Sequence, residues 1–349
     1  MIAARSAASR RILRLALGTS LCLLFSQAVA WPLSFIAPVL TLVILGLPMP
    51  PPGARKSIIL VIAMVAPMLV GSWVLLPFLE YMRPAGILLV ALGLFYTFYF
   101  TARGGQPVIG TFMSIGLTVI VTVGSISSEI MMMLVQGLTV SAAVALVFVH
   151  IAHAVLPDTP SPAGSAKSSK APIADPALAG RRALRSLAIV LPIALVFLFI
   201  NGSPAYTVVM IKVATMGQQA TADQSRAMGR SLLESTLWGG LAAMVGWNML
   251  SIWPSLLLYT LLIALAALIF GRWIFHGHAL HPKAPMASYA FLTMVVILAP
   301  AVSDGLGSSG AESAFWARLG LFVLIAVYGT LAVRVFDAFW PGPARGTGV

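Results

Sequence analysis

Long apolar segments, separated by short polar or basic ones, run through the whole chain. Of its 349 residues, 60% are hydrophobic and only 9% are charged. A helix needs about 20 apolar residues to cross a bilayer, and it must satisfy its own backbone hydrogen bonds because lipid offers no partners. The pattern predicts an all-α polytopic membrane protein, in contact with the lipid bilayer, with about twelve transmembrane helices.

A short basic motif divides these segments into two sets. The sequence RRILR at residues 10–14 returns as RRALR at residues 181–185. Each copy precedes an apolar run that is interrupted at a proline, Pro32 in the first copy and Pro204 in the second, and then resumes. We therefore predict that the chain consists of two membrane repeats of similar build.

Each repeat is predicted to contain six helices. The first repeat covers residues 1–156 and the second covers residues 181–349, with a flexible cytoplasmic linker, rich in Pro, Ser, Ala and Gly, over residues 157–180. The predicted spans are residues 13–30, 33–47, 57–77, 85–101, 107–123, 130–155, 184–200, 204–217, 231–250, 253–270, 287–302 and 314–336.

The Lys and Arg residues predict the orientation of these spans. If the N-terminus is cytoplasmic, most of the 21 basic residues fall on the inner side, as the positive-inside rule requires. An even number of spans per repeat places both termini in the cytoplasm and makes the repeats parallel, related by an axis along the membrane normal. The net charge of +12 then has a membrane explanation, and we expect no nucleic-acid partner.

Lys212 and Glu234 are ionisable residues inside predicted spans, where a charge is costly unless it is paired or faces water. Lys212 is the deeper one, and Glu234 lies about one turn into the next helix from the same side. If these helices are neighbours, Lys212 could bind an anion while Glu234 exchanges a proton. The alternative is that Lys212 snorkels to the cytoplasmic surface and Glu234 only stabilises the helical hairpin.

Three arginines are candidates for attracting anions, because guanidinium groups bind carboxylates through two hydrogen bonds. Arg14 and Arg185 close the two basic motifs, and Arg103 lies in a glycine-rich inner loop. The alternative for Arg14 and Arg185 is orientation of the helices and contact with anionic lipid. The alternative for Arg103 is an ordinary turn.

No enzymatic signature is present in the sequence. A Walker loop, a nucleophile elbow and a zinc-protease motif are all missing, and the five histidines have no Cys or carboxylate neighbours in metal-ligand spacing. We therefore expect no catalytic residue, no metal site and no cofactor.

The basic motifs, the break at Trp31-Pro32, the following segment at residues 37–40 and the six-helix duplication resemble the fusaric acid resistance family of bacterial inner-membrane proteins. The closest resemblance is to its compact branch, which lacks soluble domains and has no assigned function. The resemblance implies a multi-pass protein of the bacterial inner membrane that exports small, often aromatic, organic acids or toxic compounds. It also implies a periplasmic membrane-fusion partner and a distant kinship with aluminium-activated malate channels.

The leading hypothesis is a secondary exporter of small organic anions, driven by the proton gradient. Three alternatives stay open, namely a passive anion channel, a transporter of the major facilitator type, which also has two parallel six-helix halves, and a scaffold subunit of an envelope complex. The sequence leaves the oligomeric state open, a homo-oligomer included.

Overall fold

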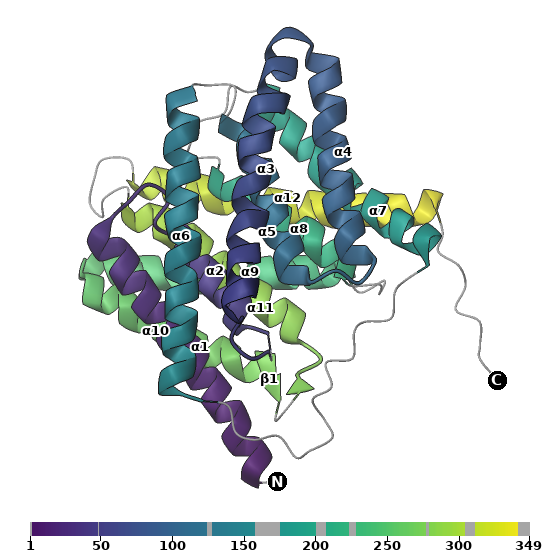
Figure 1. Cartoon of the computed structure of the whole chain (residues 1–349). Helices are drawn as coiled ribbons and strands as arrows, with labels where there is room; N and C mark the ends of the chain where they lie inside the picture. Colours follow the sequence, from purple (N-terminus) through teal and green to yellow (C-terminus); the bar gives the residue numbers. More distant parts are fainter. Residues whose placement is uncertain are drawn as a thin grey trace, which may run out of the picture.

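The computed structural model describes residues 2–47, 49–123, 128–157, 175–199, 207–222, 228–276, 279–303 and 311–340. They form twelve α-helices and one short antiparallel strand pair (Figure 1). The elements are α1 Ile2–Val29, α2 Ile36–Leu45, α3 Ala54–Tyr81, α4 Arg83–Ala102, α5 Pro107–Val123, α6 Ser128–Val155, α7 Pro176–Phe199, α8 Thr207–Ala222, α9 Met228–Ile252, α10 Leu256–Ile274, β1 Phe275–His276, β2 Ala279–Leu280, α11 Ala284–Ser303 and α12 Ala311–Phe339.

The all-helical prediction is confirmed, and a helix lies at each of the twelve predicted spans. Seven helices are long and apolar enough to cross a membrane, namely α1, α3, α4, α6, α10, α11 and α12. The chain is therefore a multi-pass membrane protein. The strand pair within the predicted loop 271–286 was not expected from the sequence.

The basic motifs lie inside helices and not in front of them, which corrects the predicted starts. The helix α1 begins at Ile2 and α7 begins at Pro176, so residues 176–180 of the predicted linker are helical. For α7 the cause is local, because proline is favourable at the first helical position and the alanines that follow it are strong helix formers. The rest of that linker, residues 158–174, lies outside the described residues.

The predicted break after α1 is confirmed and is packed against α6. The Trp31 indole Nε1 donates to Ser141 Oγ at 2.9 Å, and Ser141 Oγ donates to the Leu33 carbonyl at 3.1 Å. The Pro32 carbonyl lies against Gly137 of α6. The turn that reverses the chain is thus held by polar contacts inside the protein. The corresponding break at Pro204 lies outside the described residues.

Replacing Gly137 with alanine should destabilise the protein. The new Cβ would lie 2.2 Å from the Pro32 carbonyl oxygen, a backbone atom that cannot rotate away. We expect a loss of about 1–3 kcal/mol, the usual cost of overpacking, measured as a lower thermal unfolding midpoint in detergent. Gly320→Ala in α12 is the control, because its Cβ would meet no atom within 4 Å. Equal midpoints for the two variants would contradict the prediction.

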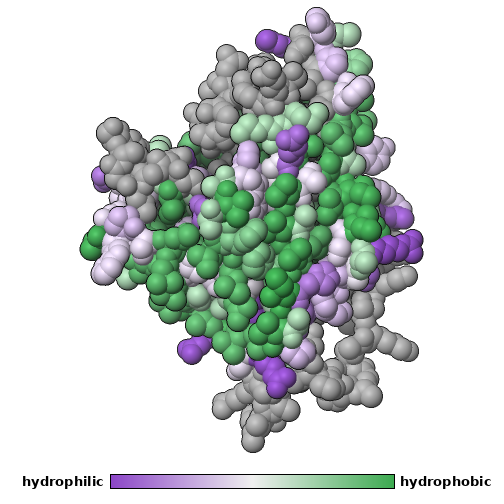
Figure 2. All heavy atoms as spheres, turned by 60° about the vertical axis from the view of Figure 1, so that its left-hand side comes forward, coloured by the Kyte–Doolittle hydropathy of each residue, from purple (hydrophilic) through white to green (hydrophobic). Residues whose placement is uncertain are grey.

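The two short helices α2 and α8 lie innermost. Nine of the ten residues of α2 are buried. The helix α8 packs against α4, α5, α7, α11 and α12, and its described side chains are buried along its whole length. The long helices carry exposed apolar side chains outward, and Figure 2 shows a broad hydrophobic face of the kind that lipid covers.

The two halves of the chain share one core. The helix α1 packs against α10 and α4 against α7, while α2 contacts α11 and α5 contacts α8. In Figure 1, α3, α4 and α6 stand upright and α12 runs across them. Buried apolar residues from both halves form a single cluster.

Candidate functional site

Lys212 lies at the centre of the protein. Its side chain is only 1% exposed, and its Nζ donates a hydrogen bond to Thr293 Oγ1 of α11. Within the part of the chain that the structure describes, it forms no ion pair. Because the side chain does not reach the surface, the snorkelling alternative does not apply to this conformation. An unpaired buried charge is expensive, which makes Lys212 a functional candidate.

The hydrogen-bonding capacity of Lys212 is only partly used. The Thr293 hydroxyl donates its own hydrogen to the Tyr289 carbonyl at 2.7 Å, so it meets Lys212 as an acceptor. An ammonium group has three N–H donors and no acceptor. Among the described residues it has one side-chain acceptor, Thr293. The remaining donors suit an anionic oxygen or water.

Further polar side chains continue from Lys212 along α8. Thr215 and Gln218 follow at intervals of three residues, which keeps them on neighbouring positions of the helix surface. Gln218 Nε2 donates to Ser114 Oγ of α5 at 3.5 Å, and both side chains are buried. Polar groups therefore extend about 9 Å along the helix axis inside an otherwise apolar core.

The helix α9 approaches this site at a glycine. A Cβ on Gly239 would lie 2.6 Å from Thr293 Cβ and 2.4 Å from the Ala290 carbonyl oxygen. Only a residue without a side chain allows this contact between α9 and α11. Gly239 was not predicted as a site residue, because no local pattern shows which glycine lies against a partner helix.

The structure does not bring Glu234 to Lys212. Glu234 Oε1 accepts from Arg230 Nε at 2.6 Å, and this pair is largely exposed. Glu234 precedes Gly239 by five residues, which is about 7.5 Å along the axis and about 140° around it. It therefore points away from the face of α9 that contacts Thr293. The Arg230–Glu234 pair lies within α9, and a role of Glu234 in stabilising the hairpin stays a prediction.

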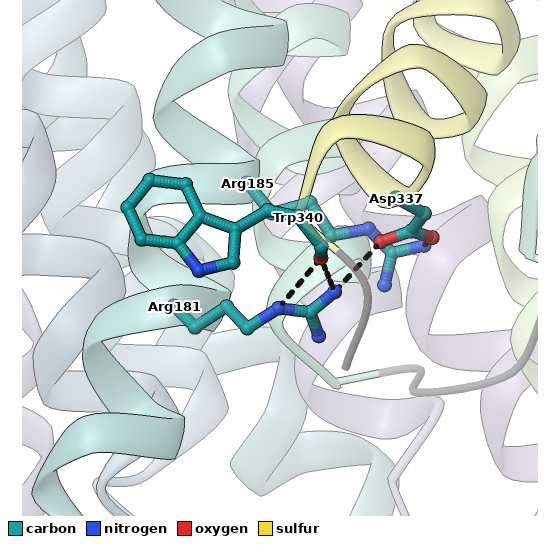
Figure 3. A network of polar contacts seen from close by, with 4 residues as sticks. All are labelled: Arg181, Arg185, Asp337 and Trp340. Carbon is teal, nitrogen blue, oxygen red and sulfur yellow. Dashed lines mark hydrogen bonds and ion pairs between the residues drawn. The ribbon is translucent and has the colours of Figure 1, made fainter. Parts of the chain in front are cut away.

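Arg185 lies in a different polar network, between α7 and α12 (Figure 3). Its Nη2 is 3.1 Å from Asp337 Oδ2 of α12, and Arg181 Nη2 is 3.3 Å from the other carboxylate oxygen. Arg181 also donates from Nε to the Trp340 carbonyl at 3.1 Å. The sequence analysis missed Asp337, although an acid near the end of an apolar run is itself a signal of pairing.

The two other arginines lie elsewhere. Arg14 is buried in α1, with 3% of its surface exposed. Arg103 follows α4 in a turn whose Gly104 has a φ of 96°, and its guanidinium lies 5.9 Å from the centre of the Tyr99 ring. This cation–π contact within one helix end agrees with an ordinary turn. Four of the five candidates have partners outside the candidate set, namely Thr293 for Lys212, Arg230 for Glu234, Asp337 for Arg185 and Tyr99 for Arg103.

Comparison with known proteins places part of the chain in a described family model. Residues 11–152 match a family model described as "Protein of unknown function (DUF2955)". This range begins in α1 and ends in α6, and the match does not link the chain to the fusaric acid resistance family. No curated protein and no solved structure matches the sequence.

Proposed function

We propose that the chain is a secondary transporter that exports small organic or aromatic anions across the bacterial inner membrane, with Lys212 as the residue that binds the anion. The observation that carries the proposal is the buried ammonium of Lys212, for which the described residues supply one side-chain acceptor, Thr293. An intramembrane cation of this kind is the usual mark of a substrate or ion pathway.

Helix packing supports the proposed arrangement in two repeats. The contacts α1–α2, α3–α5 and α3–α6 correspond to α7–α8, α9–α11 and α9–α12 six helices later. Contacts between the halves also match in pairs, since α1–α10 corresponds to α7–α4 and α2–α11 corresponds to α8–α5. Such matching is expected of repeats related by a two-fold axis. The transition between inward-facing and outward-facing states is then a rotation of the halves around α2 and α8.

The site is proposed to work on one side of this two-fold arrangement. In α2, the counterpart of α8, the buried polar side chain is the neutral Thr41, which donates to the Ala37 carbonyl at 2.9 Å. A carboxylate that reaches Lys212 would neutralise the buried charge and meet the hydroxyl groups nearby. Attraction between opposite charges is strong there, because the surrounding side chains are apolar.

Glu234 is not included in the proposed binding site, because its recorded partner is the exposed Arg230. The proton gradient as the driving force and a periplasmic membrane-fusion protein as the partner are proposed on the family resemblance. A passive anion channel is the second candidate, and the same buried cation would serve it.

A transport assay tests the proposal. Inverted membrane vesicles that contain the protein should accumulate radiolabelled benzoate, a small aromatic carboxylate, above its equilibrium level when a proton gradient is imposed. Vesicles without the protein should not. Benzoate movement that follows only its own electrochemical gradient would favour the channel, and no movement under either condition would overturn both candidates.

A further inference from the structure

An apolar groove, which Lys212 does not line, lies between α7 and α12. Its cavity has a volume of about 410 Å³ and is formed by side chains of both helices. Val196 and Leu324 are more than half exposed at its mouth, at 52% and 63%. The other main lining residues, Ile193, Phe197, Leu321 and Ile325, form its inner wall.

The arginine network lies at one end of this groove, on the same two helices. The helices run antiparallel, since Arg185 pairs with Asp337 while the Tyr328 hydroxyl donates to the Ala188 carbonyl at 3.1 Å. The groove begins seven residues after Arg185, at Pro192, which is about 10 Å along the helix axis. A molecule with one charged end and one apolar end could place its charged end at the arginines and its apolar end in the groove.

Aromatic residues mark the level of the arginines. Phe339 ends α12 and is 88% exposed, and Trp340, which follows it, is 59% exposed. Trp is enriched where a membrane helix meets the headgroup region. The arginines are then at headgroup depth. The groove, which continues along the same helices, is at the depth of the acyl chains.

The network has capacity for an anion. Arg181 and Arg185 share the carboxylate of Asp337 in this part of the described structure, and Arg182 adds a third guanidinium group next to Arg181 in the sequence. The recorded contacts of Arg181 use Nε and Nη2 (Figure 3), and a guanidinium group has further donors on Nη1. Arg182 is partly exposed beside it.

We infer that this groove is a binding site for an anionic phospholipid, with an acyl chain between α7 and α12 and the phosphate at Arg181 and Arg182. Phosphate suits paired guanidinium groups, and the apolar lining suits a hydrocarbon chain. The positive charge at the end of the groove favours an anionic lipid over a second copy of the chain, because an apolar helix surface would offer no anion to Arg182 or to the Nη1 donors of Arg181.

The test uses the full chain in a neutral detergent. Added dioleoyl phosphatidylglycerol should raise the thermal unfolding midpoint by at least about 2 °C more than the same amount of dioleoyl phosphatidylcholine. Arg182→Gln should remove most of this difference, because no described residue holds that side chain. The control is Arg55→Gln, an exposed arginine at the start of α3, which should keep the difference.

The groove is tested separately with Val196→Trp and Leu324→Trp. Each should fill the mouth and reduce saturation binding of radiolabelled phosphatidylglycerol to the folded protein at least threefold. Equal effects of the two lipids, or equal losses in the Arg182 and Arg55 variants, would overturn the site. A dimer that dissociates on Leu324→Trp would also overturn it, by showing that a second copy covers the groove.

Discussion

Replacing Lys212 with methionine should reduce benzoate transport by about ten- to a hundredfold. A hydrogen bond to a charged group contributes about 1.5–3 kcal/mol, and each 1.4 kcal/mol changes an equilibrium tenfold. Methionine has a similar length and no charge, so the variant removes the proposed anion contact and keeps most of the packing. Initial rates in inverted vesicles measure the effect, with the protein amount determined by immunoblotting. Lys283→Met is the control, because that lysine is exposed before α11.

The same variant distinguishes function from structure. Removal of an isolated buried charge is expected to leave stability unchanged or to increase it, since the desolvation of the ammonium is no longer required. We therefore expect the Lys212→Met protein to unfold at an equal or higher temperature while it transports little. A lower unfolding midpoint together with normal transport would show that Lys212 is a structural residue.

Glu234→Gln is the informative companion. Its recorded partner is Arg230, in a pair that contributes little at an exposed surface, so we expect transport to stay within about twofold of the parent. Loss of transport in this variant would show that Glu234 takes part in transport, for example in proton exchange.

Replacing Gly239 with alanine should have the largest effect on the structure of the site. The new Cβ would lie 2.4 Å from the Ala290 carbonyl oxygen and 2.6 Å from Thr293 Cβ, so α9 and α11 must separate. Overpacking of this kind costs about 1–3 kcal/mol. Thr293 would also move relative to Lys212, and we expect transport to fall with stability.

The neighbouring glycine gives a matched control for this change. A Cβ on Gly240 would lie 3.0 Å from Leu319 Cδ1, the flexible end of a side chain that can move aside. Gly240→Ala should therefore keep its free energy of unfolding within about 0.5 kcal/mol of the parent. The two midpoints in detergent and the two benzoate transport rates are the measurements. If the Gly240 variant were the less stable one, the described contact between α9 and α11 would be wrong.

Most of the helices could be predicted from the sequence because the cause of each is local. A run of apolar residues must form a helix in lipid, whatever its neighbours are, and a proline such as Pro32 interrupts it. The predicted start of α7 was wrong by eight residues, because Pro176 and the alanines after it continue the helix beyond the apolar run. Hydropathy reports burial in lipid and does not report where a helix begins in water.

The candidate residues show the limit of this reasoning. Sequence identified Lys212 as a costly charge and Arg185 as a binding group, and these properties belong to the residues themselves. The sequence predicted a pair of Lys212 and Glu234 on the basis of similar depth. In the structure, Lys212 forms a hydrogen bond with Thr293, and Arg185 forms a salt bridge with Asp337. Similar depth in the membrane is only one condition for a contact between two side chains, because both side chains must also point toward each other.

The sequence by itself determined that this chain is a multi-pass membrane protein with helices at known positions and a charge where lipid does not tolerate one. The tertiary structure decided that α8 lies among the other helices and that α9 packs closely against α11 at Gly239. It also decided that α7 and α12 form the groove beside the arginines. The rotation of each helix about its axis explains the difference. That rotation depends on the packing of many distant side chains at once, and no local pattern contains it.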